Sequence, residues 1–203
     1  MKVLRNHPRV DANAIFVIGH SLGAMLAPRI AAREPAVAGL VLLAGPTRPL
    51  HEIIVAQWRY LAALDGSVSA EEQQTIDTAV DNASAIRALT AADGSSNRRI
   101  AGASPAYWLD LRAYDQLEFA RRFKGPMLIL QGERDYQVTM EDFAGWKAAL
   151  GERSDVALRS YPGLNHLFIA GTGPASPIEY LTPAHVAGEV ITDITDWILH
   201  ARK

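Results

Sequence analysis

The pattern that most constrains this chain is Gly-x-Ser-x-Gly at residues 19–23. It follows directly on an apolar run, 15–18, and precedes a stretch with helical periodicity. A strand, a sharp turn and then a helix form the context in which this pattern carries an exposed serine nucleophile. We therefore take Ser21 as the first candidate for a catalytic residue. The predicted apolar face of the helix consists of Leu22, Met25, Leu26 and Ile30.

Both glycines of the pattern have a predicted steric role. In so tight a turn, a Cβ at Gly19 or at Gly23 is expected to clash with neighbouring backbone. Ser21 is expected to adopt a strained backbone conformation at the tip of the strand, above the N-terminus of the helix. The hydroxyl of Ser21 would then be exposed.

Composition sets the class of protein. The 203 residues are 49% hydrophobic and 21% charged, which is typical of one globular domain, or one domain with an insertion. A net charge of −2 without a basic block argues against nucleic acid and against an anionic membrane surface. The absence of cysteine excludes disulfides, thiolate metal sites and a cysteine nucleophile. No apolar run is long enough for a signal peptide or a membrane span, so we expect a cytoplasmic protein without membrane contact.

Four short apolar runs are typical of buried parallel strands, and each is followed by helical periodicity. These runs are 15–19, 40–44, 127–131 and 156–161. Continuous apolar strands that alternate with helices predict an α/β fold, in which helices cover both faces of a mostly parallel sheet.

About 75 residues without a strand pattern separate the second run from the third. We predict a helical cap insertion at 46–123, over one end of the sheet, and a core made of 1–45 and 124–203. Ser69 and Thr139 each begin a pattern that resembles a capping box. Thr182 and Pro183 predict the start of the last helix. The apolar stripe of that helix consists of Val186, Val190, Ile194, Trp197 and Ile198.

A serine hydroxyl needs a base to take its proton, and the base needs an acid to orient it. Catalytic groups in open α/β sheets collect at the carboxyl ends of the strands. Asp135 follows the third run and His166 follows the fourth, so both are expected at the edge that carries Ser21. His166 would act as the base, and Asp135 would fix its tautomer and stabilise the imidazolium.

Other assignments of the acid and the base stay open at this point. Glu133 could replace Asp135 as the acid. Five further histidines compete with His166: His7, His20, His51, His185 and His200. A base at position 20 would be badly placed to reach the hydroxyl of its neighbour, and His185 and His200 are expected on the surface of the last helix.

These residues together resemble the α/β-hydrolase superfamily. The matching pieces are 19–23, 132–135 and 163–166, in the order in which that superfamily carries its nucleophile, acid and base. The lead-in 7–11 looks like the esterase and dienelactone-hydrolase-like branch. The resemblance implies a carboxylic ester hydrolase that works through an acyl-enzyme on Ser21 and needs no cofactor.

The resemblance also implies a truncated α/β-hydrolase fold, because the nucleophile of that superfamily follows the fifth strand and here follows the first. The N–H of Leu22 is expected to be one oxyanion donor, and the loop that carries the second donor is missing. The strand 15–19 would then have an open apolar edge, which proteins rarely leave uncovered. We expect a homodimer that pairs two such edges, or cover by the N-terminal segment.

His20, Trp58, Tyr107 and Trp108 are candidate substrate-binding residues. The alternative for the aromatic residues is that they form the core of the insertion itself. No cluster of histidine and acidic residues has the spacing of metal ligands, so we expect no metal. Besides a small-ester hydrolase, two other functions stay open: a catalytically impaired dimeric scaffold or binding protein, and an acyltransferase or peptidase.

Overall fold

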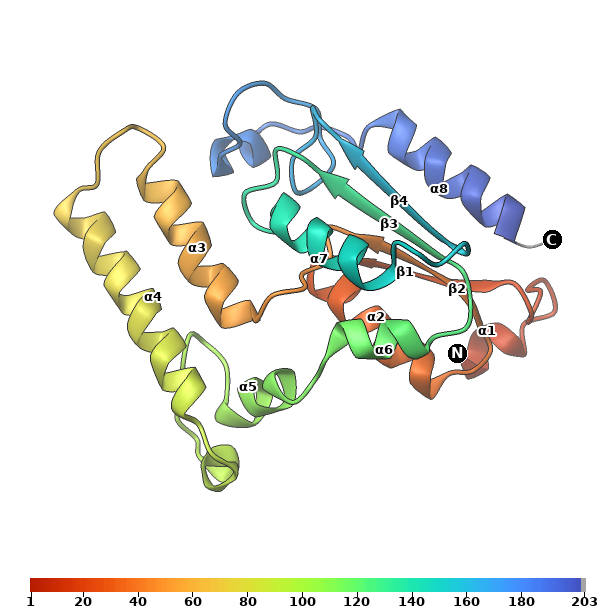
Figure 1. The fold of residues 1–203 in the computed structure, drawn as a ribbon, viewed down its shortest axis with the longest axis horizontal. Coiled ribbons are helices and arrows are strands. Elements are labelled where there is room, and N and C mark those ends of the chain that lie inside the picture. Colours follow the sequence, from red (N-terminus) through yellow and green to blue (C-terminus); the bar gives the residue numbers. More distant parts are fainter. Residues whose placement is uncertain (202–203) are drawn as a thin grey trace. The chain divides into compact units, whose positions relative to one another are not determined.

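The computed structural model describes residues 1–201 and divides into two compact units (Figure 1). The first unit joins residues 1–47 to the part of the chain from 116 onward, and the second is 48–115. The predicted cap insertion, 46–123, stays a prediction. Residues 116–122 form helix α6, which packs on helix α2 within the first unit.

Four parallel strands form the sheet of the first unit, in the order β1-β2-β3-β4. Their bounds are β1 Ile15–His20, β2 Val37–Leu43, β3 Met127–Gly132 and β4 Val156–Tyr161. The predicted α/β class with a parallel sheet is confirmed. Strand β2 begins three residues earlier than predicted, because Val37 and Gly39 pair with the start of β1.

Alternate residues of the two central strands face two separate apolar clusters. On one face, Leu40, Leu42, Met127 and Ile129 pack with residues of α2, α6 and α7. On the other face, Val41, Leu43, Leu128 and Leu130 pack with the loop after β4 and with α8 (Figure 1). Continuous apolar strands are needed because helices or loops cover both faces of the sheet.

The helices of the first unit follow the strands. Their bounds are α1 Lys2–Arg5, α2 Leu22–Arg33, α6 Gln116–Arg122, α7 Met140–Leu150 and α8 Gly188–Ala201, with a 3₁₀ turn η2 at Pro177–Leu181. The capping box predicted at Thr139 is confirmed at the start of α7, where Asp142 supplies the reciprocal carboxylate.

The predicted apolar face of α2 is confirmed at Met25, which is buried, and is wrong at the other three positions. Ile30 is 44% exposed, and Leu22 and Leu26 are half-buried. Small residues make the closest contact with the sheet instead, since Ala24, Ala27 and Ala31 are buried in the core cluster. A helix that lies this close to a sheet needs small side chains at the contact, so the large residues lie at its margins.

The predicted start of the last helix is also wrong. Residues 183–187 have no regular structure, and α8 begins at Gly188. The reason is a long-range bond: the N–H of Ala187 donates to the carbonyl of Phe168 (2.9 Å), which fixes this segment against the loop after β4. His185 therefore lies outside the helix, and Val186 is 41% exposed. The rest of the stripe packs as predicted through Val190, Ile194 and Trp197.

The second unit is helical, with α3 Leu50–Ala62, α4 Ala70–Ala88, a 3₁₀ turn η1 at Ala91–Ser95, and α5 Pro105–Arg112. The predicted capping box at the start of α4 is confirmed, since Ser69 and Glu72 bond each other's backbone N–H groups. No helix within residues 1–201 is long and apolar enough to cross a lipid bilayer.

Candidate active site

Ser21 lies in the sharp turn between β1 and α2. Its backbone has φ 55° and ψ −122°, a region that non-glycine residues rarely occupy. Its N–H donates to the carbonyl of Leu43 at the end of β2 (2.8 Å). The strained turn predicted from the sequence is present, and strain of this kind is typical of functional sites.

The two glycines of the turn differ in role. A Cβ on Gly19 would lie 2.5 Å from the carbonyl carbon of Gly23 and 2.7 Å from the nitrogen of Ala24, so only glycine fits there. A Cβ on Gly23 would meet no atom within 4 Å. The predicted clash at Gly23 is therefore wrong, because that residue lies on the exposed side of the first turn of α2.

Asp135 follows β3 and is 4% exposed. Its Oδ1 accepts the backbone N–H groups of Gln137 (2.8 Å) and Val138 (3.0 Å). Its Oδ2 accepts from Nε2 of Gln131 (3.1 Å) and lies 2.7 Å from Nδ1 of His166. Both oxygens of a buried carboxylate are thus bonded, and the carboxylate is fixed in place.

His166 follows β4 and is 5% exposed. Its loop crosses the end of β3 at close range, since a Cβ on Gly132 would lie 2.5 Å from the carbonyl oxygen of Leu164 and 2.6 Å from that of Asn165. The bond from Nδ1 to Asp135 fixes the tautomer with the proton on Nδ1, which leaves Nε2 as the basic nitrogen.

His20 connects this loop to the end of β1. Strands β1 and β4 lie at opposite edges of the sheet. Even so, the rings of His20 and His166 have centroids 4.6 Å apart, and Nε2 of His20 lies 2.8 Å from the carbonyl oxygen of His166. Burial lowers the pKa of His20 from its ordinary value, and the bond to His166 opposes that shift only in part. The residue before Ser21 and the loop of His166 are therefore in direct contact.

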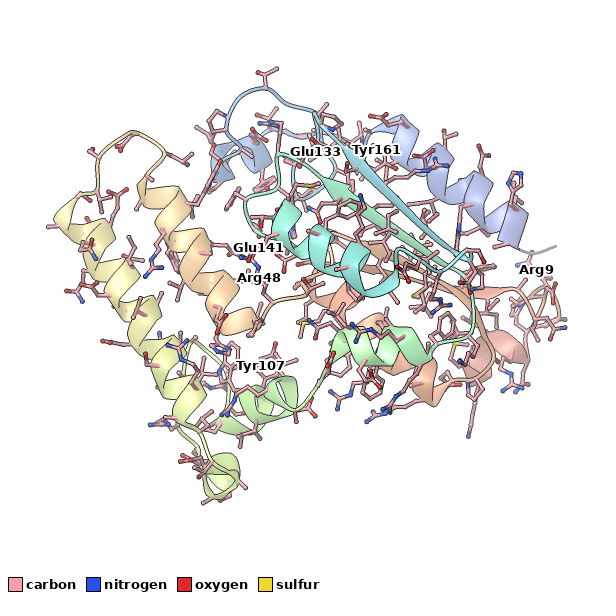
Figure 2. The ribbon with its side chains drawn as sticks, in the orientation of Figure 1. Arg9, Arg48, Tyr107, Glu133, Glu141 and Tyr161 are labelled. Carbon is pink, nitrogen blue, oxygen red and sulfur yellow. The ribbon has the colours of Figure 1, made fainter. Side chains whose placement is uncertain are left out.

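Glu133, the alternative acid, directly follows β3 and is exposed. Figure 2 labels it beside Tyr161, at the carboxyl end of the neighbouring strand β4. Its backbone N–H donates to the carbonyl of Tyr161 (3.0 Å), and its carboxylate accepts from the hydroxyl of Ser160 (2.7 Å). Asp135, and not Glu133, is the residue bonded to His166.

The remaining histidines lie elsewhere. His7 is exposed and accepts the backbone N–H of Arg9, and His200 is exposed and bonded to the carbonyl of Asp196. His51 is buried in the helical unit, where its Nε2 has no hydrogen-bond partner among the described residues.

The aromatic candidates of the helical unit differ in exposure. Trp108 is 2% exposed and its Nε1 donates to the carbonyl of Ile100, so it is part of the core of that unit. Tyr107 is 37% exposed and Trp58 is 43% exposed. Trp58 and His51 line a pocket of about 400 Å³ that is formed by helical-unit residues alone.

Sequence reasoning missed two buried polar residues, one bonded to Asp135 and one beside His166. Gln131 is 1% exposed, and its Nε2 bonds Asp135 and the carbonyls of Gly132 (3.1 Å) and Val138 (2.8 Å). Asn165 is fully buried beside His166. A signal was present for Gln131, because an amide in an otherwise apolar strand needs buried partners.

A parallel sheet that presents a strained serine after one strand, and a bonded aspartate and histidine after two others, defines the α/β-hydrolase class. Within that class the chain belongs to the family described as "Serine aminopeptidase, S33", whose sequence model matches residues 1–171.

The chain is 37% identical over 199 residues to "Esterase EstD" of Thermotoga maritima. The match covers 98% of this chain and 45% of the relative, so the chain spans about half the length of that protein.

Two solved structures share the fold. Est1E from Butyrivibrio proteoclasticus has a TM-score of 0.54 at 15% identity, and the match covers 98% of this chain and 66% of that one. Acetyl xylan esterase 1 from Thermoanaerobacterium sp. JW/SL YS485 has a TM-score of 0.52 at 18% identity, covering 100% of this chain and 50% of that one. These structures support the α/β-hydrolase fold of the chain.

Proposed function

We propose that the protein hydrolyses small carboxylic esters through an acyl-enzyme on Ser21, with His166 as the base and Asp135 as the acid. The observation that carries the proposal is the bond of 2.7 Å between Nδ1 of His166 and Oδ2 of Asp135, in a loop that reaches the end of β1. The esterase name of the Thermotoga maritima relative favours an ester as the substrate.

In the proposed reaction, Oγ of Ser21 attacks the ester carbonyl carbon while Nε2 of His166 takes the hydroxyl proton. The carboxylate of Asp135 stabilises the imidazolium. The carbon–oxygen bond to the alcohol then breaks, and His166 returns the proton to the departing alkoxide. Water repeats the sequence on the acyl-enzyme, which releases the carboxylic acid and restores Ser21.

The N–H of Leu22 is our proposed donor to the oxyanion of the tetrahedral intermediate. Leu22 is the first residue of α2, and the first N–H groups of a helix have no acceptor within the helix. The positive end of the helix dipole favours negative charge at this position. Loss of one such donor costs about 100- to 1,000-fold in rate.

Substrate contacts remain a proposal for His20, Tyr107, Trp58 and Trp108. His20 adjoins the nucleophile, and Tyr107 and Trp58 keep exposed ring surface. Of the four, Trp108 has the least support, because its ring and its indole N–H are both buried within the helical unit.

We further propose a homodimer that pairs two copies of β1. Within the described residues this strand lies at the edge of the sheet and its Ile18 is 55% exposed. An apolar strand edge is a template for pairing with another strand. Light scattering tests the dimer, and a monomer at micromolar concentration would contradict it.

A peptidase is the second candidate, because the family description names aminopeptidases. A panel of p-nitrophenyl esters and matched p-nitroanilides separates the two reactions, and faster cleavage of the amides would overturn the ester assignment. A fluorophosphonate probe tests the nucleophile itself. We expect mass spectrometry to find the label on Ser21, whereas an unlabelled, folded protein would favour the scaffold hypothesis.

A further inference from the structure

One carboxylate joins the two loops that carry the proposed acid and base. Glu179 lies in η2, the 3₁₀ turn Pro177–Leu181. Its Oε2 accepts from Nδ2 of Asn165 (2.8 Å) and from Nη1 of Arg134 (3.4 Å), and its Oε1 pairs with Nη2 of Arg134. Asn165 directly precedes His166 and Arg134 directly precedes Asp135. Glu179 therefore binds the residue before His166 and the residue before Asp135.

The guanidinium of Arg134 is held on several sides. Its Nε donates to the carbonyl of Gly173 (2.8 Å), and its Nη2 donates to that of Thr172 (3.2 Å). A Cβ on Gly171 would overlap the guanidinium, which would have to shift to make room for it. The side chains of Arg134 and Glu179 are 10% and 21% exposed. Paired, planar hydrogen bonds of this kind fix direction as well as distance.

Asn165 connects Glu179 to the turn that carries His166. The side chain is fully buried, and its Oδ1 accepts the N–H groups of Leu167 (3.0 Å) and Ile169 (3.1 Å). Phe168 in the same turn has φ 57°, which is costly for a bulky residue. The bonds to Asn165 hold the turn in this conformation.

Glu179 is suited to this role because it stays ionised at neutral pH. Burial by itself raises its pKa, but the bonds from Arg134 and Asn165 and the charge of Arg134 outweigh that effect and lower the pKa overall. A charged acceptor binds the two donors more strongly than a neutral one.

We propose that Glu179 and Arg134 are positioning residues, which clamp the loop of Asp135 to the loop of His166 and so fix the bond between them. The proposal rests on the proposed function for its effect on rate. A shift of about 1 Å in a catalytic group can cost on the order of 100-fold, so loss of the clamp is expected to lower kcat while KM changes little.

Glu179→Ala removes the clamp, and Glu179→Gln restores an oxygen acceptor without the charge. Asp155→Ala is the matched control, because Asp155 pairs with Arg153 (2.7 Å), and Arg153 also bonds backbone carbonyls of Ala120 and Phe123. That cluster lies at the amino end of β4, away from the triad. Two readouts are used: hydrolysis of p-nitrophenyl butyrate, and the downfield proton NMR signal of the His166 Nδ1–H bond.

We expect Glu179→Ala to lower kcat by about 10- to 100-fold and to weaken or broaden the Nδ1 proton signal. Glu179→Gln should recover part of the kcat and part of the Nδ1 proton signal. Asp155→Ala should change neither of these readouts, even if its melting temperature falls. An unchanged signal and kcat in Glu179→Ala, or equal losses in Asp155→Ala, would overturn the clamp. If the wild type lacks hydrolysis that depends on Ser21, the proposed function fails, and the NMR signal still decides for or against the clamp.

Discussion

Nε2 of His20 lies 2.8 Å from the carbonyl oxygen of His166, and the two rings have centroids 4.6 Å apart. This contact joins the residue before the proposed nucleophile to the loop of the proposed base. Since β1 and β4 are at opposite edges of the sheet, the loop must cross the ends of β3 and β2 to make it. We expect this contact to help hold the loop of His166 over the end of β1.

His20→Phe keeps a ring against His166 but removes the bond to its carbonyl. We expect kcat for p-nitrophenyl acetate to fall on the order of tenfold, because the loop of the proposed base loses one anchor. His200→Phe is the control, since His200 also bonds a backbone carbonyl but lies near the end of α8. Equal kcat values in wild type and His20→Phe would count against the anchor.

The lowered pKa of His20 predicts that stability falls in acid. Burial disfavours the charged ring, so the unfolded chain binds this proton at a higher pH than the folded one. The free energy of unfolding should then fall as pH drops below about 6.5, the pKa of an unperturbed histidine, towards the lower pKa of the folded state. Urea unfolding at pH 7.5 and pH 5.5 measures the change. His20→Phe should reduce the difference in the free energy of unfolding between pH 7.5 and pH 5.5. A difference as large as in the wild type would show that His20 is not the cause.

The two glycines of the turn that carries Ser21 should respond differently to alanine. Gly19→Ala places a Cβ against the backbone of Gly23 and is expected to destabilise the fold by about 1–3 kcal/mol. The added Cβ in Gly23→Ala would enter open space, and the change removes a glycine from the first turn of a helix. The free energy of unfolding should therefore stay equal or rise by about 0.5–1 kcal/mol. Chemical denaturation of both variants checks the pair. A larger loss in Gly23→Ala would mean that the turn differs from the one described.

Asp135 and Glu133 provide a matched test of the acid. Asp135→Asn removes the charge beside Nδ1 of His166 and permits the wrong tautomer. The same change lowers kcat about 10⁴-fold in the Ser-His-Asp triad of serine proteases. We expect a loss on the order of 1,000-fold or more here, with Glu133→Gln close to wild type. The ratio of kcat values for the two variants is the measurement, and a larger loss in Glu133→Gln would reverse the assignment.

The two central strands could be predicted from the sequence because a strand buried on both faces is one apolar run. The edge strands β1 and β4 are only partly buried, although their runs are also largely apolar. The whole of β3 is buried, including Gln131. Both confirmed capping boxes are equally local, since each depends on two residues three positions apart. The start of α8 could not be predicted in this way, because the bond from Ala187 to Phe168 joins segments that only the fold brings together.

The proposed triad could be selected by loop position, but the supporting roles of Asn165 and Glu179 could not. Asp135 and His166 each follow a predicted strand, so the shared edge of the sheet brings them together. Asn165 and Glu179 gain their roles only where the two loops meet, and no local pattern marks Glu179 in advance. The helical periodicity of α2 pointed to its large apolar residues, whereas Ala24, Ala27 and Ala31 are the residues buried in the core cluster.

Hydrolysis of p-nitrophenyl acetate and butyrate by the wild type and by Ser21→Ala tests the central claim most directly. The account predicts steady release of p-nitrophenolate by the wild type, and a loss of at least about 1,000-fold in kcat for a Ser21→Ala variant with the same circular dichroism spectrum. Equal rates in the two proteins, or no release by a folded wild type, would contradict the claim that this chain is a serine esterase.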